Sequence, residues 1–426
     1  MINKFLPWRL PSWANSRIAG NTGVMTVGIG VQIVLQGIAF ILVTRLMGVR
    51  AYGAFISVTA LATIIAAFAG WGGDQLLIRT VATARDEFAA ALGTGLLYFL
   101  ATAPVLALIA VLAIPYLVTA SVPWLAVLLV VLADVVFARM NTFAVNCFQA
   151  FERGRDMARL GIVLYLARAL AAVIWGFAVA RHDPMSWAWF YLASSVVAGG
   201  FGMIEVLRRL GRPVWRIEWG EWRDGGFFAL QMGSFLSFRD IDKPVTAALS
   251  SLSQAGLYAA AFRIADVAAV PVRALMFSTY VRFFQHGAAG TRGSFAFAKS
   301  LLPAGLAIGA IAGVGLAIAS SIATQILGAN YAGIATVLLI LTPMPLFYAL
   351  YYIGADTLVS GGHLGQRTLI QALLPIFDVG LCLALVPRYG AAGAAIATCG
   401  THAVLVIATW ASAIHFARLE AATEAS

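Results

Sequence analysis

Long blocks of apolar residues dominate the chain, and short polar stretches separate them. The apolar residues follow neither the alternation of a half-buried strand nor the heptad spacing of a coiled coil. Blocks of about 20 apolar residues have the length that a helix needs to cross a hydrocarbon core of about 30 Å. The pattern therefore predicts an all-α integral membrane protein.

About twelve transmembrane helices can be placed, and the seventh and eighth are the least hydrophobic. The predicted spans are 20–46, 52–72, 88–118, 124–148, 157–180, 187–207, 226–249, 256–283, 300–327, 331–358, 369–386 and 391–416. The longest polar segment, 208–224, lies at the middle of the chain and alternates arginine with tryptophan. We expect it to lie flat on the cytoplasmic surface and to link two six-helix lobes, residues 1–212 and 213–426, around a central cavity.

Composition and charge sharpen this prediction. The chain is 61% hydrophobic and 11% charged, which excludes a soluble domain. With twelve spans, the termini and the even-numbered turns carry 18 of the 28 Lys and Arg residues. The opposite side has only Arg45, Arg50, Arg181 and Arg388. Short loops rich in Lys and Arg stay cytoplasmic, so both termini are predicted to be cytoplasmic and the positive charge does not indicate a nucleic-acid partner. We expect the first span to be retained, with Trp8 and Trp13 as interfacial anchors.

Sequence motifs of soluble enzymes are missing from the chain. It has no phosphate-binding G-x-x-x-x-G-K-[ST], no zinc-binding H-E-x-x-H, no G-x-S-x-G and no G-x-G-x-x-G. The five histidines show no ligand spacing, and Cys147, Cys382 and Cys399 lie inside apolar blocks. We therefore predict no catalytic residue, metal or cofactor, and we expect membrane transport.

Charged residues inside the predicted spans are the most informative polar positions. An ionisable residue at the bilayer centre costs roughly 2.5–3.5 kcal/mol, so six bases would cost about 15–21 kcal/mol, more than a typical folding free energy of about 5–15 kcal/mol. These bases must therefore face a water-filled cavity, form ion pairs with acidic side chains, or do both. They are Arg139, Arg168, Arg239, Lys243, Arg263 and Arg273.

The seventh helix carries the densest cluster. Arg239 and Lys243 are four residues apart and share a helix face, and Asp240 and Asp242 lie between them. Asp242 is three residues from Arg239, so we expect the two to pair. Pro244 removes a backbone hydrogen bond beside the cluster and predicts a broken helix.

The neighbouring spans add further charges. Arg263, Asp266 and Arg273 fall on one stripe of the eighth helix, and the fourth and fifth helices add Asp134, Arg139 and Arg168. Six bases against four acids suggest a cavity that attracts anions. The alternative is that every charge is paired and only holds the helices together.

Some polar residues have competing interpretations. Asp356 and Asp378 could bind a coupling proton or sodium ion, or they could reach water near helix ends, and we favour the second interpretation. Tyr348, Tyr351 and Tyr352 are packing or interfacial aromatics by default, although aromatic rings can also stack on sugars.

Other features have structural expectations. Asp74 and Arg79 follow three glycines, which indicates a turn held by a local ion pair. Gly305, Gly309 and Gly313 form a small-residue stripe that is typical of a helix-packing face.

Several short motifs resemble those of a known family, and their order and spacing span nearly the whole chain. Within the chain, residues 47–55 resemble residues 255–262, which indicates an internal repeat of the kind that secondary transporters have. The matching segments are 45–48 leading to 52–55, 68–70 with 73–74 and Arg79, 256–258 with 261–264, 327–328 with Tyr331, and 389–397. On these segments the chain resembles a polysaccharide-type flippase, in the superfamily of multidrug and toxin extruders and peptidoglycan-precursor flippases.

The resemblance implies a substrate and a mechanism. Such proteins move undecaprenyl-diphosphate-linked oligosaccharides from the cytoplasmic to the periplasmic leaflet of the bacterial inner membrane, for O-antigen, capsule or exopolysaccharide assembly. Alternating access of two six-helix bundles is the implied mechanism. The chain departs from the peptidoglycan-precursor subgroup, which usually has two further helices, and its first helix lacks the proline of some drug extruders.

The sequence thus predicts a flippase for a lipid-diphosphate-linked oligosaccharide. The residues proposed to bind the substrate are Arg239, Lys243, Arg263, Arg273, Arg139 and Arg168. Charge balance or ion coupling is assigned to Asp240, Asp242, Asp266, Asp134, Asp356 and Asp378. A cation-coupled multidrug exporter and a membrane glycan polymerase or ligase are the alternatives. Membrane lipids are expected partners. Whether a proton or a sodium ion drives transport, and whether a polysaccharide polymerase is a partner, is left open.

Overall fold

The computed structural model describes residues 18–118, 122–216, 218–287 and 290–425. All regular structure in these ranges is helical, which confirms the predicted fold class. The expected anchors Trp8 and Trp13 lie outside the described residues.

The elements up to residue 209 correspond to the first six predicted spans. They are α1 (Ile18–Met47), α2 (Val49–Ala66), α3 (Gly73–Thr83), η1 (Arg85–Glu87), α4 (Phe88–Leu117), α5 (Trp124–Val131), the π-helix η2 (Leu132–Ala138), α6 (Arg139–Ala150), α7 (Gly154–Ala178) and α8 (Pro184–Arg209). The fourth span is continuous through α5, η2 and α6, whereas α3 is a short helix that follows the second span.

The elements after residue 209 correspond to the last six spans, and three of these spans are broken. They are η3 (Trp219–Glu221), α9 (Trp222–Asp240), α10 (Asp242–Leu249), α11 (Leu252–Ala268), α12 (Val270–Gly287), α13 (Gly290–Leu327), η4 (Ala329–Tyr331), α14 (Ile334–Ile340), α15 (Met344–Ser360) and α16 (Leu364–Ala425). The predicted break beside Pro244 is confirmed, because α9 ends at Asp240 and α10 begins at Asp242.

The helices account for twelve membrane crossings. Within the described ranges, nine stretches are long and apolar enough to span a membrane. The last, 364–421, reverses direction at Gly390 (φ 56°, ψ −128°) and therefore supplies two crossings. Side-chain contacts between its two legs confirm the hairpin: Gln366 with Ser412 at 3.4 Å and Thr401 with Asp378 at 2.8 Å. The remaining two predicted crossings correspond to α9–α10 and α11–α12, the least hydrophobic spans of the sequence.

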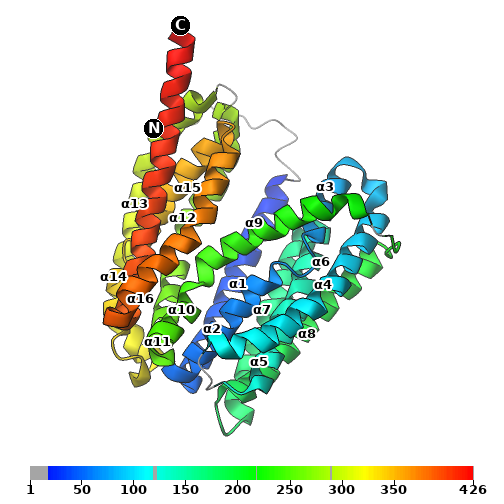
Figure 1. The fold of residues 1–426 in the computed structure, drawn as a ribbon, viewed down its shortest axis with the longest axis vertical. Helices are drawn as coiled ribbons and strands as arrows, with labels where there is room; N and C mark the ends of the chain where they lie inside the picture. The colour runs from blue at the N-terminus through cyan, green and yellow to red at the C-terminus, as the bar shows by residue number, and fades with distance from the viewer. Residues whose placement is uncertain (1–17, 119–121, 217, 288–289, 426) are drawn as a thin grey trace, which may run out of the picture.

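Two helix bundles make up the fold, and α9 lies between them (Figure 1). The N-terminal lobe contains α1 to α8, and the C-terminal lobe contains α10 to α16. The bundles lie close together where α2 meets α11, and they diverge towards the end where α3 and the last residues of α16 lie. The structure thus has a closed end, which we define by this α2–α11 contact.

Reciprocal glycines make the closed end possible. A Cβ on Gly53 would lie 1.8 Å from the Leu252 carbonyl oxygen, and a Cβ on Gly256 would lie 2.0 Å from the Val49 carbonyl oxygen. Only glycine permits backbones to approach this closely. Both glycines belong to the two segments that resemble each other in sequence, so the repeat places equivalent helix starts face to face.

The polar segment after α8 is bound to the N-terminal lobe through its backbone. The Val214 N–H donates to the Ala89 carbonyl at 2.8 Å, Thr94 donates to the Arg216 carbonyl at 2.6 Å and Tyr98 donates to the Glu218 carbonyl at 2.7 Å. The segment is therefore attached to the N-terminal lobe, and its hydrogen bonds fix where α9 begins.

The start of α9 is docked on a strained turn after α2. Three successive residues, Gly70, Trp71 and Gly72, have positive φ values, of which 47° for Trp71 is unusual for a residue other than glycine. The Trp71 ring stacks on Trp222 at 5.0 Å, and its indole N–H donates to the Trp222 carbonyl at 2.9 Å. These contacts offset the backbone strain and tie α9 to the N-terminal lobe.

Long-range partners replace the expected local pair of Asp74 and Arg79. Arg79 pairs with Asp224 at 2.6 Å and with Glu221 at 2.9 Å, both from the start of α9. Asp74 turns inward to Arg139. The expectation of a local ion pair was wrong because Asp74 and Arg79 are five residues apart on α3, which places their side chains on different faces of the helix.

The glycine stripe of α13 is a packing face, as predicted. A Cβ on Gly309 would lie 2.9 Å from the Leu346 Cα, and one on Gly313 would lie 2.7 Å from the Thr342 carbonyl oxygen. The stripe holds α13 against the α14–α15 span.

Candidate functional site

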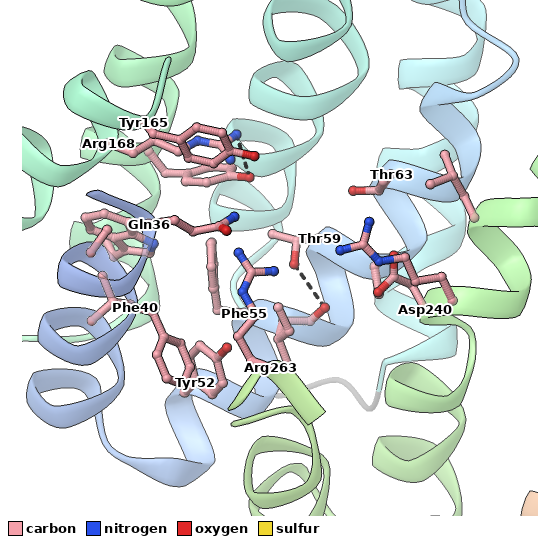
Figure 2. Close-up of a pocket in the computed structure, with 18 residues that line it drawn as sticks. Gln36, Phe40, Tyr52, Phe55, Thr59, Thr63, Tyr165, Arg168, Asp240 and Arg263 are labelled. Carbon is pink, nitrogen blue, oxygen red and sulfur yellow. Dashed lines mark hydrogen bonds between the residues drawn. The ribbon is translucent and has the colours of Figure 1, made fainter. Parts of the chain in front are cut away.

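A cavity of about 300 Å³ lies between the lobes. Its walls come from α1, α2, α7 and α8 on one side and from α9 and α11 on the other. We call it the central cavity. The polar and aromatic side chains of Figure 2 surround it: Gln36, Phe40, Tyr52, Phe55, Thr59, Thr63, Tyr165, Arg168, Asp240 and Arg263.

Three of the predicted bases line this cavity, and each comes from a different helix. Arg168 lies on α7, Arg239 on α9 and Arg263 on α11. Figure 2 shows the Arg263 guanidinium pointing into the space between Gln36 and Thr59. The structure thus brings together bases that are far apart in the sequence.

Arg263 is the least satisfied of these bases. Among the described residues, its guanidinium forms no hydrogen bond and no ion pair. Arg239 is held loosely, since its Nη2 lies 3.8 Å from Asp266 Oδ2. A guanidinium at membrane depth is costly unless a partner compensates it. These two side chains therefore have capacity for an anionic ligand.

Arg168 is positioned by residues behind it. Its Nη2 donates to the Tyr191 hydroxyl at 3.0 Å, and that hydroxyl donates to Asp134 Oδ1 at 2.7 Å. Asp134 lies in the π-helix η2, 3.7 Å from Arg168 Nη2. Such π-helical turns occur frequently at functional sites. Asp134 thus serves to orient Arg168 rather than to line the cavity.

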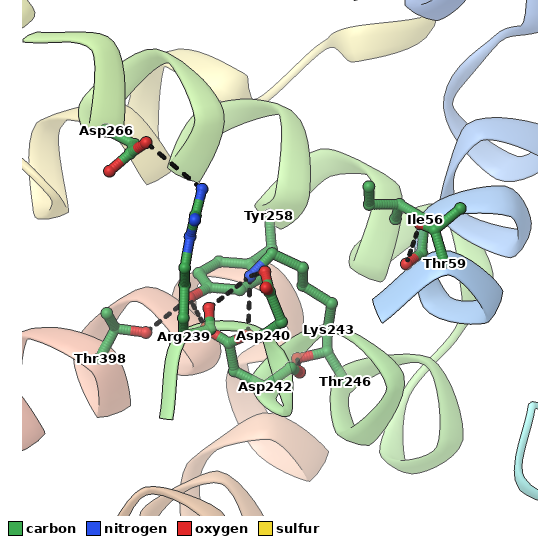
Figure 3. Close-up of polar contacts among 10 residues, drawn as sticks. All are labelled: Ile56, Thr59, Arg239, Asp240, Asp242, Lys243, Thr246, Tyr258, Asp266 and Thr398. Atoms are coloured by element: carbon green, nitrogen blue, oxygen red, sulfur yellow. Dashed lines mark hydrogen bonds and ion pairs between the residues drawn. The ribbon is translucent and has the colours of Figure 1, made fainter. Parts of the chain in front are cut away.

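Lys243 belongs to a buried ion cluster at the break between α9 and α10 (Figure 3). Its Nζ lies 3.0 Å from Asp240 Oδ1, 3.0 Å from Asp242 Oδ1 and 2.9 Å from the Arg239 carbonyl oxygen. Asp242 also accepts a hydrogen bond from Tyr258. The expected Asp242–Arg239 pair was wrong because Asp242 faces the C-terminal lobe, where Lys243 and Tyr258 occupy it.

A second cavity of about 300 Å³ lies inside the C-terminal lobe, and we call it the C-lobe cavity. Arg239 lines both cavities, so the two meet at this residue. Arg273 and Asp266 also line the C-lobe cavity, paired at 2.7 Å as their predicted stripe implies. Asp378 lies in its wall.

Arg139 lies in neither cavity. Its two terminal nitrogens each lie 2.9 Å from an Asp74 oxygen, its Nε donates to the Ala69 carbonyl at 3.0 Å, and Asn146 donates to Asp74 at 2.7 Å. This buried network joins α6 to the turn after α2. Arg139 therefore has a full set of internal partners.

Replacing Asp74 by asparagine should destabilise the protein strongly, because it leaves the Arg139 guanidinium buried without its counter-charge. Breaking one side of a buried pair costs about 3–5 kcal/mol. Thermal unfolding in detergent should show this loss. Arg79→Ala is the matched control, since its exposed pairs contribute about 0–1 kcal/mol. Equal stability of the two variants would contradict this account.

The acids on the last spans are more buried than expected. Asp356 is 5% exposed and Asp378 is 2% exposed. Asp356 lies near the end of α15, as expected, but its burial contradicts the expected contact with water; Asp378 is also buried and lies well within the first leg of α16.

Uncharged cavity residues were not found from the sequence. Gln36 of α1, and Thr59 and Thr63 of α2, line the central cavity. Thr59 and Thr63 are four residues apart on α2, which places both hydroxyls on one face of the helix. A prediction based on charged residues alone therefore identified only part of the lining of the central cavity.

The family can now be stated from comparison. The profile of the family described as "Polysaccharide biosynthesis protein" matches residues 18–283, which is more than half of the chain. The chain belongs to the polysaccharide biosynthesis protein family. The resemblance found in the sequence motifs is thereby confirmed. No curated protein matches the chain.

Solved structures share the fold at low sequence identity. A multidrug resistance MATE family transporter in an inward-facing conformation matches with a TM-score of 0.69 and 15% identity, over 94% of this chain and 99% of that one. The lipid II flippase MurJ in an inward closed conformation matches with a TM-score of 0.71 and 12% identity, over 91% and 87%. A MOP superfamily transporter from Pyrococcus furiosus, described as having a binding pocket of reverse polarity, matches with a TM-score of 0.66 and 15% identity, over 94% of this chain and 95% of that one. The protein is therefore a multi-pass membrane protein with the two-lobed fold of flippases and exporters.

Proposed function

We propose that the protein flips an undecaprenyl-diphosphate-linked oligosaccharide from the cytoplasmic to the periplasmic leaflet for surface polysaccharide assembly. It acts by alternating access, as a transporter and not as an enzyme. The observation that carries this proposal is the unpaired guanidinium of Arg263 in the central cavity, with Arg239 and Arg168 beside it.

The charge of the cavity favours an anion. Three arginines and one acid, Asp240, line it, and Asp240 is already paired with Lys243. Arginine is the side chain best suited to bind phosphate oxygens in pairs. The diphosphate therefore binds between Arg263 and Arg239, with Arg168 as a third contact. Arg139 and Lys243 stabilise the two helix bundles through their ion pairs. The carboxylates of Asp240, Asp242 and Asp266 compensate the positive charge of the bases when no substrate is bound.

An apolar groove supports a lipid substrate. It has a volume of about 210 Å³, lies between α1, α11 and α13, and shares Gln36, Phe40 and Arg263 with the central cavity. Its remaining walls are aliphatic, for example Val267 and Ile322. A polyprenyl tail can lie in this groove and in the bilayer while its diphosphate reaches Arg263.

Filling the groove should slow the transport of long-chain lipids. Ala319→Trp places a large ring in the groove wall, so flipping of an undecaprenyl-linked substrate should fall about tenfold, whereas a substrate with a short prenyl chain should move normally. Ile318→Trp is the matched control, because Ile318 is 66% exposed on the same helix. An equal loss for both chain lengths would contradict the proposed path of the tail.

The positive-inside pattern supports the orientation. We propose that both termini are cytoplasmic in the bacterial inner membrane, which places Arg50 and the closed end on the periplasmic side. Residues 1–212 and 213–426 then act as the two moving lobes. The helix α9 begins on the first lobe and ends at the ion cluster of the second, so it couples their movement. Proton or sodium coupling would use Asp134, Asp356 or Asp378.

Transport by the purified protein in liposomes tests the proposal. A lipid-diphosphate-linked oligosaccharide should become accessible to a membrane-impermeant reagent, and an organic cation should not move. The organic cation is included because the fold is similar to that of a multidrug resistance MATE family transporter. Movement of the cation against a pH gradient without movement of the glycolipid would replace the proposed function by multidrug export.

A further inference from the structure

An aromatic wall lines one side of the C-lobe cavity. The rings of Tyr348 and Tyr352 are stacked with an interplanar angle of 20° and a centroid distance of 6.1 Å. His402 packs against Tyr348 edge to face at 5.2 Å, and Phe238 lies 5.0 Å from His402 on its other side. These contacts hold the two tyrosines in place and leave them as part of the cavity lining.

Three polar side chains of the same cavity, those of Asp378, Arg367 and Tyr351, each have a buried polar atom without a hydrogen-bond partner among the described residues. Asp378 is 2% exposed; its Oδ1 accepts from Thr401, and its Oδ2 has no partner among the described residues. Arg367 Nε is likewise a buried atom without a partner in that part of the chain. Buried polar groups are almost always hydrogen-bonded, so these atoms have the capacity to bind the polar groups of a ligand.

This combination matches the chemistry of a sugar. One face of a pyranose ring presents C–H bonds, which pack on an aromatic ring, and its edge presents hydroxyls, which donate to a carboxylate and accept from a guanidinium. A cavity of about 300 Å³ is at the lower end of the range for small-ligand pockets, roughly 300–1,000 Å³. An organic cation would also find aromatic rings here, but three arginines (Arg239, Arg273 and Arg367) and three acids (Asp242, Asp266 and Asp378) line the cavity, so its wall has no net charge that selects a cation.

The apolar groove, the central cavity and the C-lobe cavity form a series through shared residues. Arg263 lines both the apolar groove and the central cavity, and Arg239 lines both the central cavity and the C-lobe cavity. In a lipid-linked oligosaccharide, the lipid, the diphosphate and the sugars follow one another in the same order.

We propose that the C-lobe cavity is the saccharide subsite, where a sugar close to the diphosphate stacks on Tyr348 and Tyr352 and bonds to Asp378 and Arg367. This inference rests on the proposed function and adds to it a recognition site for the glycan. The diphosphate provides affinity for the whole substrate class, and this cavity distinguishes lipids that carry a sugar from those that do not.

Binding to two probes separates these contributions. The probes are undecaprenyl diphosphate and the lipid-linked oligosaccharide fraction extracted from the source organism, titrated into the purified protein in nanodiscs. The wild type should bind the oligosaccharide lipid about tenfold more tightly. The variant Y348L/Y352L should bind undecaprenyl diphosphate as the wild type does and lose the preference. The variant Y348F/Y352F keeps the aromatic rings and should keep most of the preference for the oligosaccharide lipid. Tyr116→Leu, at a side chain that is 90% exposed, controls for the substitution itself.

The outcomes distinguish this inference from the function on which it rests. Equal binding of both probes by the wild type would overturn the saccharide subsite alone, as would a preference that survives in Y348L/Y352L. A parallel loss of both probes in that variant would assign the tyrosines a merely structural role and also overturn the proposal. Failure of the wild type to bind either probe would instead remove the proposed function.

Discussion

Replacing Arg263 by glutamine should weaken the binding of undecaprenyl diphosphate about 10- to 100-fold. Hydrogen bonds to a charged group contribute about 1.5–3 kcal/mol, and each 1.4 kcal/mol corresponds to a factor of ten. Arg263 has no internal partner among the described residues, so its removal leaves no buried acid uncompensated and the fold should remain intact. Titration in nanodiscs, with thermal unfolding of the same samples, measures both quantities.

Arg85→Gln is the matched control for Arg263→Gln. Arg85 carries the same charge but is exposed on η1, outside both cavities. Its replacement should leave binding unchanged at physiological ionic strength, because screening limits the reach of surface charges to about 8 Å. Similar losses for the two variants would indicate general attraction by a basic protein and would contradict a specific diphosphate site.

Introducing a methyl group at Gly53 should force the closed end apart. The Cβ of Gly53→Ala would meet the Leu252 carbonyl oxygen at 1.8 Å, and no side-chain rotation relieves a clash with backbone. Overpacking costs typically 1–3 kcal/mol, which is enough to shift a two-state population about 5- to 150-fold. We expect the lobes to separate at this end and flipping to fall sharply.

Thiol labelling can measure this shift. A cysteine at Ala54, which is 5% exposed, should react slowly in the parent protein and rapidly in the Gly53→Ala variant. Gly256→Ala should have the same effect, because its Cβ would meet the Val49 carbonyl at 2.0 Å. Gly30→Ala is the control, since nothing lies within 4 Å of its Cβ. Slow labelling in both closed-end variants would show that the glycine contact does not hold the lobes together.

The membrane spans were predictable because their signal is local. A block of about 20 apolar residues specifies a crossing without reference to any other segment. The breaks at Pro244 and at Gly390 were also accessible, since proline removes a backbone hydrogen bond and Gly390 has a positive φ of 56° that favours glycine. The division of 124–150 into α5, η2 and α6 was not, because no residue type specifies a π-helical turn.

The partners of the buried charges were not predictable from one sequence. Arg139 pairs with Asp74 across 65 positions, and Arg79 pairs with Asp224 across 145. Helical spacing identifies residues on one face of a helix, but it does not determine which other helix that face meets. For the same reason the sequence grouped Lys243 with Arg239 and Arg263, although only the two arginines line the central cavity.

The initial rate of glycolipid flipping by the R239Q/R263Q variant tests the central claim most directly. Wild type and variant are reconstituted at equal density, and the lipid-diphosphate-linked oligosaccharide that becomes accessible to an impermeant reagent is followed over time. The account predicts flipping by the wild type and a loss of at least about 100-fold in a folded variant. Flipping by the variant at the wild-type rate would show that the substrate does not depend on the bases of the central cavity, and would contradict the account.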